Sequence, residues 1–247
     1  MRFSFVIPAY QEERRIGATL AAIAEFAATP EGRASLCGDS DAEVIVVDDG
    51  STDRTAAVVA EQIEGFPIAL RVLSEPHRGK GAAVRAGMLA AHGELRFLAD
   101  ADGAMPCREI PRFVAAAAQA PIVIGSREGV TARRIDEPLY RHVRGRIFNY
   151  WVRLWAVRGI ADTQCGYKLF TAAAAEAVFS QATIDGFGFD VEVLYVAQRR
   201  GLAVEELPIE WHHRPISRLR PVRDSIAMAW HVLRVRWNAL CGRYVST

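Results

Sequence analysis

Residues 43–55, EVIVVDDGSTDRT, decide the fold, because they pass from a strand into a helix through a polar turn. The unbroken run of β-branched residues is typical of a strand covered on both faces, as in a parallel sheet. The run ends at Asp48 and Asp49, and the Ser, Thr and Asp at 51–53 are suited to cap the next helix. One cap does not need two preceding acids, so both carboxylates are candidates to bind a nucleobase imide or ribose hydroxyls.

The same order of strand, polar turn and helix recurs through the first half of the chain. RFSFVIP, IALRVL, ELRFLAD and PIVIGS predict further strands, and helical patterns separate them. This alternation predicts an α/β fold with a mainly parallel sheet, in which ligands bind outside the carboxyl ends of the strands. Polar clusters follow five successive strands: PAYQEE, DDGST, EPHRGKG, DADGA and GSRE. We therefore expect all five clusters at one rim.

The second half contains a long helix near residues 138–157 and then DTQCGYKLF and GFGFDVEVLYVAQRRG. One face of the long helix is predicted to carry Leu139, Val143, Ile147, Trp151 and Leu154. No repeat or Pro-rich linker divides the halves, so residues 1–247 are predicted to form one domain. Its parts are residues 1–126, residues 127–220 and an amphipathic C-terminal helix over 221–247.

Composition excludes several classes of protein. A chain of 247 residues with 51% hydrophobic residues can bury a full core, and 30 basic against 29 acidic residues predict no nucleic-acid partner. The cysteines and histidines lack zinc spacing, and no G-x-S-x-G elbow indicates a hydrolase. We find neither a leader pattern nor a run long enough to span a bilayer, and we expect a cytoplasmic protein.

The stretch FLADADGAMP, residues 97–106, places Asp100 and Asp102 just past a strand. Carboxylates two positions apart converge on one point only beyond the strand's end, and a hard cation such as Mg²⁺ or Mn²⁺ relieves their repulsion. A second such pair, Asp39 and Asp41, lies in a polar loop. At this Asp content, roughly half of one such pair is expected by chance, so the surrounding sequence must decide whether the pair binds a metal.

RGKGAAVRAG, residues 78–87, sets Arg78 and Lys80 beside two glycines at a helix start. It is not a Walker loop, because Ser74 and Gly81 stand where Gly and Ser/Thr are needed, and it fails the dinucleotide fingerprint at Val84. Free N–H groups, the helix dipole and two cations would favour an anion there. The alternative is a solvated helix cap.

The last helix carries an apolar stripe with arginines at its margins. The stripe consists of Ile226, Ala229, Trp230, Leu233, Trp237 and Leu240, and the arginines are Arg223, Arg234, Arg236 and Arg243. Packing onto the domain is one interpretation of this pattern. Trp with flanking Arg is also typical of a helix that lies on an anionic membrane.

Taken in order and spacing, seven motifs resemble glycosyltransferase family 2. They are VIPAYQEERRI, VIVVDDGSTDRT, RGKGAAVRAGM, DADGA, GSR, DTQCGYKLF and FDVEVL. They look more narrowly like the dolichyl-phosphate β-glucosyltransferase branch, with polyprenyl-phosphate mannosyltransferases as cousins. The resemblance runs from about residue 3 to 240, and DTQCGYKLF and RGKGAAVRAG are its most specific parts.

The resemblance implies a glycosyltransferase A fold that moves a hexose, with inversion, from a nucleotide diphosphate to a lipid phosphate. It implies glucose from UDP-glucose, Mg²⁺ or Mn²⁺, a nucleotide-sugar half over 1–126 and an acceptor half over 127–220. By motif, Pro8, Tyr10, Glu12, Asp48 and Asp49 would hold the nucleoside, and Lys80 would lie near the base or diphosphate. The metal would bind Asp100 and Asp102. The acceptor phosphate would meet Arg127 and Arg146, with Ser217 and Arg218 closing over phosphate.

The sequence leaves open whether the acceptor is a lipid phosphate or a hydroxyl group. An ionised acceptor phosphate needs no strong base, whereas a soluble or natural-product hydroxyl acceptor needs one, and Asp162 and Asp190 are the candidates. Asp162 is equally suited to cap a helix or anchor a loop.

Relatives of this kind usually carry a membrane-spanning helix. Its absence from the sequence favours a soluble acceptor, or a peripheral anchor in the last helix at the inner face of the membrane.

Two other classes of function remain as alternatives. A sugar nucleotidyltransferase should have a Gly-rich basic loop after the first strand, but PAYQEERRI has no glycine before Gly17. A binding module without catalysis would be excluded by metal-dependent turnover. The paired carboxylates and the basic rim favour an enzyme.

Overall fold

The computed structural model describes residues 2–36, 42–213 and 221–244. Within these ranges the chain alternates strands with helices, as the first half of the sequence predicts. The strands are β1 Phe3–Ala9, β2 Ala42–Asp49, β3 Ala69–Glu75, β4 Leu95–Leu98, β5 Ile122–Ser126, β6 Arg133–Ile135, β7 Lys168–Thr171, β8 Val204–Pro208 and β9 Glu210–His212. The helices are α1 Ile16–Ala28, α2 Pro30–Leu36, α3 Thr55–Ala60, α4 Lys80–Ala90, α5 Ile110–Ala116, α6 Leu139–Trp155, α7 Ala172–Phe179, α8 Phe189–Arg199 and α9 Pro221–Leu240, with a 3₁₀ turn η1 at Cys107–Glu109.

The main sheet has the order β3-β2-β1-β4-β7-β5-β8 in the described part of the chain. Its strands are parallel except β7, which is antiparallel to both β4 and β5. Because β5 is therefore parallel to β4, the carboxyl ends of β1 to β5 meet at one rim, as predicted. β6 and β9 form a separate parallel pair.

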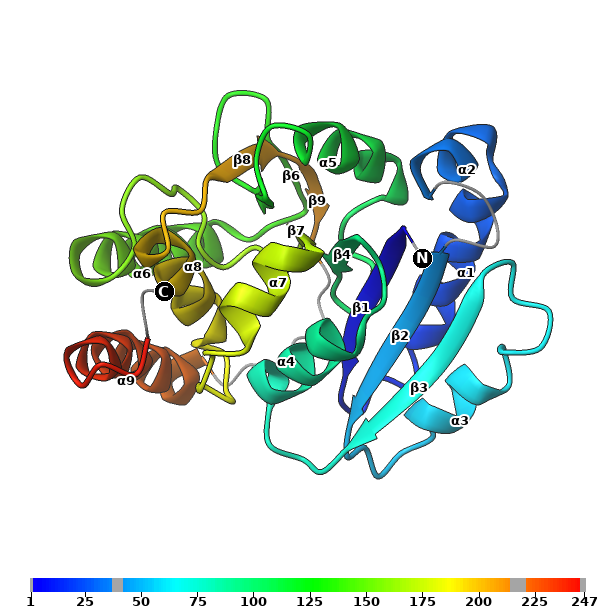
Figure 1. Ribbon diagram of the computed structural model, residues 1–247, viewed down its shortest axis with the longest axis horizontal. Helices are drawn as coiled ribbons and strands as arrows, with labels where there is room; N and C mark the ends of the chain where they lie inside the picture. The colour runs from blue at the N-terminus through cyan, green and yellow to red at the C-terminus, as the bar shows by residue number, and fades with distance from the viewer. Residues whose placement is uncertain (1, 37–41, 214–220, 245–247) are drawn as a thin grey trace.

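Two apolar layers enclose the sheet, which explains the unbroken hydrophobic runs of its strands. Phe3, Phe5 and Ile7 of β1 face α1, α2, α3 and α5. Val6 of β1 points the other way, into a layer built with α4, α7 and α8. Figure 1 shows α4 and α7 in front of the strands and α1 behind them.

The long helix and the last helix differ from the sequence expectation in what they bury. Of the stripe predicted on α6, Val143, Ile147 and Leu154 are solvent-exposed and Trp151 is partly buried, while Val152 enters the core. Of the stripe predicted on α9, Trp230, Leu233, Trp237 and Leu240 are exposed, and Val232 and Val235 pack inward instead. The packing interpretation therefore holds for α9, but through the opposite face. None of the helices in the described ranges has both the length and the apolar run needed to span a bilayer.

Candidate active site

The rim at the end of β4 holds two carboxylates and a lysine. Lys80 Nζ donates to Asp100 Oδ1 at 2.6 Å, and Ala104 N donates to Asp102 Oδ1 at 3.1 Å. Gly166 lies directly against Asp100, because a Cβ at this glycine would be 2.0 Å from Asp100 Oδ2. The motif that contains Gly166 thus shapes the space around the acidic pair.

The two carboxylates differ electrostatically. Burial would raise the pKa of Asp100, but the charges of Lys80, Lys168 and Arg127, with the hydrogen bond from Lys80, together hold the pKa below its usual value. The pKa of Asp102 is raised, first by burial and then by the charge of Asp100. A cation between the two would relieve that repulsion.

The residues present fit a divalent ion that is completed by a ligand. No group of three or more His, Cys, Asp or Glu side chains gathers as a metal site within the described ranges. Mg²⁺ in nucleotide sites commonly takes one or two carboxylates and fills its remaining positions with phosphate oxygens and water. Asp100 and Asp102 suit that mode of binding.

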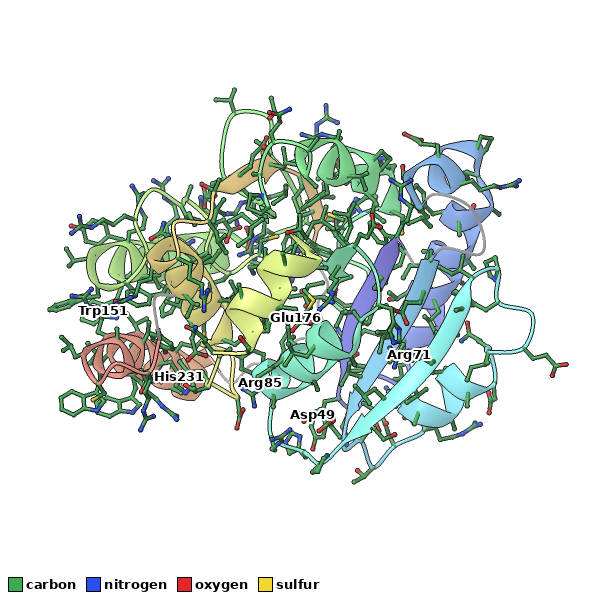
Figure 2. The ribbon with its side chains drawn as sticks, in the orientation of Figure 1. Asp49, Arg71, Arg85, Trp151, Glu176 and His231 are labelled. Carbon is green, nitrogen blue, oxygen red and sulfur yellow. The ribbon has the colours of Figure 1, made fainter. Side chains whose placement is uncertain are left out.

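Asp49 anchors the loop that carries Lys80. Its buried carboxylate accepts from Arg78 N at 2.9 Å and Gly79 N at 3.0 Å, and His77 Nδ1 lies 2.9 Å from it. Figure 2 shows Asp49 at the carboxyl end of β2, next to this loop. Because the loop already hydrogen-bonds both carboxylate oxygens of Asp49, the main contact of the Asp49 side chain is with the protein.

Two glycines let this loop pack against the turn before α8. Gly81 N donates to Asp185 O at 2.7 Å, and a Cβ at Gly81 would lie 2.3 Å from Ile184 O. Gly79 has φ +122°, which favours glycine, and a Cβ there would lie 2.6 Å from Asp185 O.

Arg85 of α4, labelled in Figure 2, holds the same turn by donating to Asp185 Oδ1 at 2.8 Å. The N–H groups of Arg78, Gly79, Gly81 and Ala82 are already bonded to the protein, so the side chain of Lys80 is the main group that this loop offers a ligand.

The end of β1 is tied to the turn after β2. Gln11 N donates to Ser51 Oγ at 2.9 Å, and Glu12 N donates to Thr55 Oγ1 at 2.7 Å. The capping expected of residues 51–53 comes from Asp53, whose Oδ1 accepts from Thr55 N, the first residue of α3, at 3.0 Å, while Arg54 at the N-cap position provides no side-chain cap. The Ser51 and Thr55 hydroxyls join two strand ends.

The nucleoside residues expected from the motifs surround that junction. The Tyr10 ring stacks on His77 with centroids 4.1 Å apart, and Glu12 Oε1 lies 2.5 Å from Arg15 Nη2. Asp48 accepts from Ser51 N at 3.2 Å. Pro8 lies within β1, paired in register with Val47.

The partly buried Arg127 and the fully buried Asp162 form an ion pair at the end of β5. The guanidinium donates to Asp162 from Nε at 2.7 Å and from Nη2 at 2.9 Å, and Arg127 N adds a bond at 3.0 Å. Although burial would raise the pKa of Asp162, Arg127 reverses this and holds the pKa far below its usual value. Arg127 also lies over the Trp211 ring, 5.5 Å from its centroid.

Lys168 and Asp190 form a second buried pair beside the rim. Lys168 is fully buried, and its Nζ donates to Asp190 Oδ1 at 2.5 Å and to the Cys165 carbonyl. The pKa of Asp190 is raised, because burial outweighs the effect of the Lys168 charge. Sequence reasoning missed Lys168, although a lysine inside the apolar run YKLF signals a buried partner.

Comparison with known proteins identifies the family of this chain. The model of glycosyl transferase family 2 matches residues 4–179. The chain belongs to glycosyltransferase family 2. A dolichyl-phosphate beta-glucosyltransferase of Trichomonas vaginalis is 36% identical over 94% of this chain and 72% of its own length. The enzymes of that name from Dictyostelium discoideum and Homo sapiens are 34% and 32% identical, over 97% and 98% of this chain and 75% and 77% of theirs.

Solved structures support the fold of this family 2 glycosyltransferase. Glucosyl-3-phosphoglycerate synthase of Mycobacterium tuberculosis superposes with a TM-score of 0.67 at 20% identity, over 100% of this chain and 80% of that one. That structure contains Mn²⁺, UDP-glucose and phosphoglyceric acid. The likeness confirms the glycosyltransferase A fold expected from the motifs.

Not all the expected family 2 site residues come together. Arg146 is exposed in the middle of α6, whereas Arg127 is paired with Asp162 at the rim. Ser217 and Arg218 lie outside the described residues, as do Asp39 and Asp41. The rim residues that the structure does place together are Lys80, Asp100 and Asp102.

Proposed function

We propose that this glycosyltransferase moves glucose from UDP-glucose, with inversion, to a polyprenyl phosphate in a metal-dependent reaction. The observation that carries the proposal is the cluster of Lys80, Asp100 and Asp102 at the rim. The similarity to dolichyl-phosphate beta-glucosyltransferases over nearly the whole chain supports the choice of sugar and acceptor.

Asp100 and Asp102 would hold Mg²⁺ or Mn²⁺ against the donor diphosphate. The ion would supply electrostatic stabilisation of the departing nucleoside diphosphate. Lys80 adds a fixed positive charge at the same place, 2.6 Å from Asp100. Together these residues would promote departure of the diphosphate without donating a proton to it.

The nucleoside would bind between the ends of β1 and β2. Pro8, Tyr10, Glu12 and Asp48 border this junction, and Asp49 contributes by holding the loop of Lys80. The stack of Tyr10 on His77 gives the junction a flat aromatic wall. We assign base recognition to this wall and to Asp48.

The ion pairs of Asp162 and Asp190 favour an acceptor that needs no base. Asp162 is fully buried and tied to Arg127, so we propose that it anchors the loop after β5. Arg127 would face the acceptor phosphate, with Arg146, Ser217 and Arg218 as the further phosphate contacts the motifs suggest. Asp190 has a raised pKa, and it is the base candidate if a soluble hydroxyl acceptor is used instead.

We place the reaction in the cytoplasm, at the inner face of the membrane, where a polyprenyl phosphate presents its head group. Cys107, Cys165 and Cys241 form no disulfide with one another, which suits a reducing compartment.

The test is transfer of labelled sugar to polyprenyl phosphate in detergent, with UDP-glucose and GDP-mannose in parallel, and with Mg²⁺, Mn²⁺ or chelator. We expect chelator-sensitive glucolipid from UDP-glucose. Asp102→Asn should lower turnover by about a thousandfold or more while the fold persists. Glu94→Gln, an exposed change away from the rim, is the matched control.

The outcomes of this assay separate the alternatives. Metal-dependent hydrolysis of the donor without labelled lipid would move the acceptor to a soluble hydroxyl and assign the base to Asp190. Near-normal rates in Asp102→Asn would remove the metal assignment.

A further inference from the structure

Glu192 of α8 is a fully buried carboxylate that joins two distant parts of the chain. Its Oε2 accepts from Thr183 N at 2.9 Å and from Ile184 N at 2.8 Å. Its Oε1 accepts from Thr183 Oγ1 at 2.8 Å and from the Tyr244 hydroxyl at 2.7 Å. A buried charge is tolerated where hydrogen bonds replace water, so these bonds fix the turn before α8 and the segment after α9 relative to each other.

The Tyr244 hydroxyl ties α9 to this carboxylate. Asn238 of α9 is buried and donates from Nδ2 to the Tyr244 hydroxyl at 3.2 Å and to Thr183 Oγ1 at 3.1 Å. Burial, followed by the charge of Glu192, raises the pKa of Tyr244. The hydroxyl therefore keeps its proton and donates it to Glu192. Thr183, Glu192, Asn238 and Tyr244 together are the Glu192 cluster.

The turn that the Glu192 cluster holds also caps α4. This helix begins at Lys80, and no side chain caps it at Gly79. Gly81 N donates to Asp185 O at 2.7 Å, and Ala82 N donates to the same oxygen at 3.2 Å. The first N–H groups of a helix have no partner inside it, so a carbonyl supplied by a distant segment fixes where α4 begins.

The turn is held from both sides. Arg85 of α4 donates from Nη1 to Ala182 O at 3.2 Å. His231 of α9 packs on the other side, where a Cβ at Gly188 would lie 2.3 Å from His231 Cβ. Figure 1 shows the turn, in yellow, between α4 and α9, and Figure 2 labels Arg85 and His231. A displacement on the α9 side must therefore displace the cap of α4.

We propose that the Glu192 cluster positions Lys80 for catalysis. The cluster fixes residues 183–188, Asp185 of this turn caps α4, and α4 begins with the lysine that donates to Asp100 at 2.6 Å. Glu192 and Tyr244 are thus positioning residues, which affect turnover through Lys80 without touching the substrate. The inference rests on the proposed role of Lys80 at the donor diphosphate.

A second bond between a hydroxyl and a buried glutamate supplies a matched control. Ser4 Oγ donates to Glu43 Oε1 at 2.7 Å, the same distance as between Tyr244 and Glu192. Ser4 lies near the amino end of β1, away from the rim. Since Ser4 Oγ also accepts from Gly93 N at 2.8 Å, Ser4→Ala should destabilise the fold at least as much as Tyr244→Phe.

Hydrogen exchange tests the link between the cluster and α4 without any substrate. The exchange of the Gly81 and Ala82 amides is compared in wild type, Tyr244→Phe and Ser4→Ala under conditions in which all three stay folded. We expect roughly tenfold faster exchange in Tyr244→Phe and the wild-type rate in Ser4→Ala. Equal exchange in the two variants would overturn the proposal.

Kinetics test whether this link matters for catalysis. Metal-dependent turnover of UDP-glucose should fall roughly tenfold in Tyr244→Phe, in kcat more than in KM, because Lys80 acts on charge that develops in the transition state. Ser4→Ala should stay within about twofold of wild type. In the Lys80→Met background, Tyr244→Phe should cause no further loss of turnover. Thermal unfolding should show that Tyr244→Phe destabilises both backgrounds equally.

Glu192 offers a second pair of variants. Glu192→Leu leaves Thr183 N and Ile184 N without an acceptor and should lower turnover more than Tyr244→Phe does. Glu192→Gln keeps a carbonyl oxygen for these two N–H groups, and the hydroxyls of Thr183 and Tyr244 can accept from its amide. It should recover most of the turnover that Glu192→Leu loses. If Glu192→Leu does not fold, Tyr244→Phe and Ser4→Ala still decide the question.

Two kinetic results would overturn the proposal. A loss in Tyr244→Phe that adds fully to that of Lys80→Met would mean that Tyr244 does not act through Lys80. An equal loss of turnover in Ser4→Ala would assign the effect to stability alone. A wild-type protein without donor turnover would instead contradict the proposed function, and the exchange experiment would then decide the link by itself.

Discussion

Two lysine–aspartate pairs near the rim have almost the same length but different surroundings. Lys80 and Asp100 are 2.6 Å apart and each about one quarter exposed, whereas Lys168 and Asp190 are 2.5 Å apart with the lysine fully buried. A partly exposed pair can release its partner to a ligand, while a buried pair cannot be opened without leaving a charge in the core. Burial thus distinguishes an ion pair that can act on the substrate from one that maintains the structure of the site.

Removing the buried lysine should have the largest effect. Lys168→Met leaves Asp190 buried without its partner, and we expect a loss of about 3–5 kcal/mol in the free energy of unfolding. Urea denaturation followed by fluorescence measures it. A loss below about 1 kcal/mol would contradict the structural role of the pair.

The double variant Lys168→Met with Asp190→Leu sharpens this test. Replacing both charges by apolar side chains should restore most of the lost stability, because no uncompensated charge remains. If the double variant is as unstable as the single one, lost packing and not the ion pair explains the effect.

Removing the exposed lysine should act on turnover instead. Lys80→Met is expected to lower the rate of donor cleavage by about 10²–10³-fold, as for loss of one electrostatic contact to the departing group. The free energy of unfolding should change far less than in Lys168→Met. Equal loss of stability in both variants would contradict the distinction between the catalytic pair and the structural pair.

Gly166 offers a smaller change at the exposed pair. Gly166→Ala would place a Cβ 2.0 Å from Asp100 Oδ2, so the carboxylate must move. A displacement near 1 Å costs roughly a hundredfold in rate, which steady-state kinetics at saturating metal would measure. Wild-type kinetics in this variant would show that the position of Asp100 is not critical.

The smallest effect is expected at the surface. Arg2 and Glu94 lie 3.9 Å apart with side chains 60% and 75% exposed. Glu94→Gln should change the free energy of unfolding by less than about 0.5 kcal/mol, because solvent already screens the pair. A larger change in thermal denaturation would mean that exposure is a poor guide to the other two pairs.

The sequence predicts the rim well, because it predicts strand ends well. Asp48 and Asp49 end a β-branched run, Asp100 and Asp102 follow the apolar strand LRFL, and parallel strands must bring such positions together. What it cannot predict is the direction each side chain takes there. Asp49 turns into the loop of residues 77–79, and only the fold shows this.

Contacts between distant segments were harder to foresee. Lys168 and Asp190 are 22 residues apart, and no local pattern links them. The stripes on α6 and α9 were correctly identified as apolar. Both helices, however, are also anchored by buried residues on a second side, so periodicity alone could not decide which side meets the core.

The position of β7 has a consequence for how the chain acquires its structure. β5 is made before residue 127, yet its neighbours in the sheet are β7 and β8, which come from residues 168–171 and 204–208. During synthesis β5 therefore has no pairing partner in the sheet until strands that lie at least 42 residues later in the chain have emerged. We expect a chain halted at residue 126 to expose β5 as an unpaired, aggregation-prone strand. In the full chain, we expect the last strands to complete the sheet in one late, cooperative step.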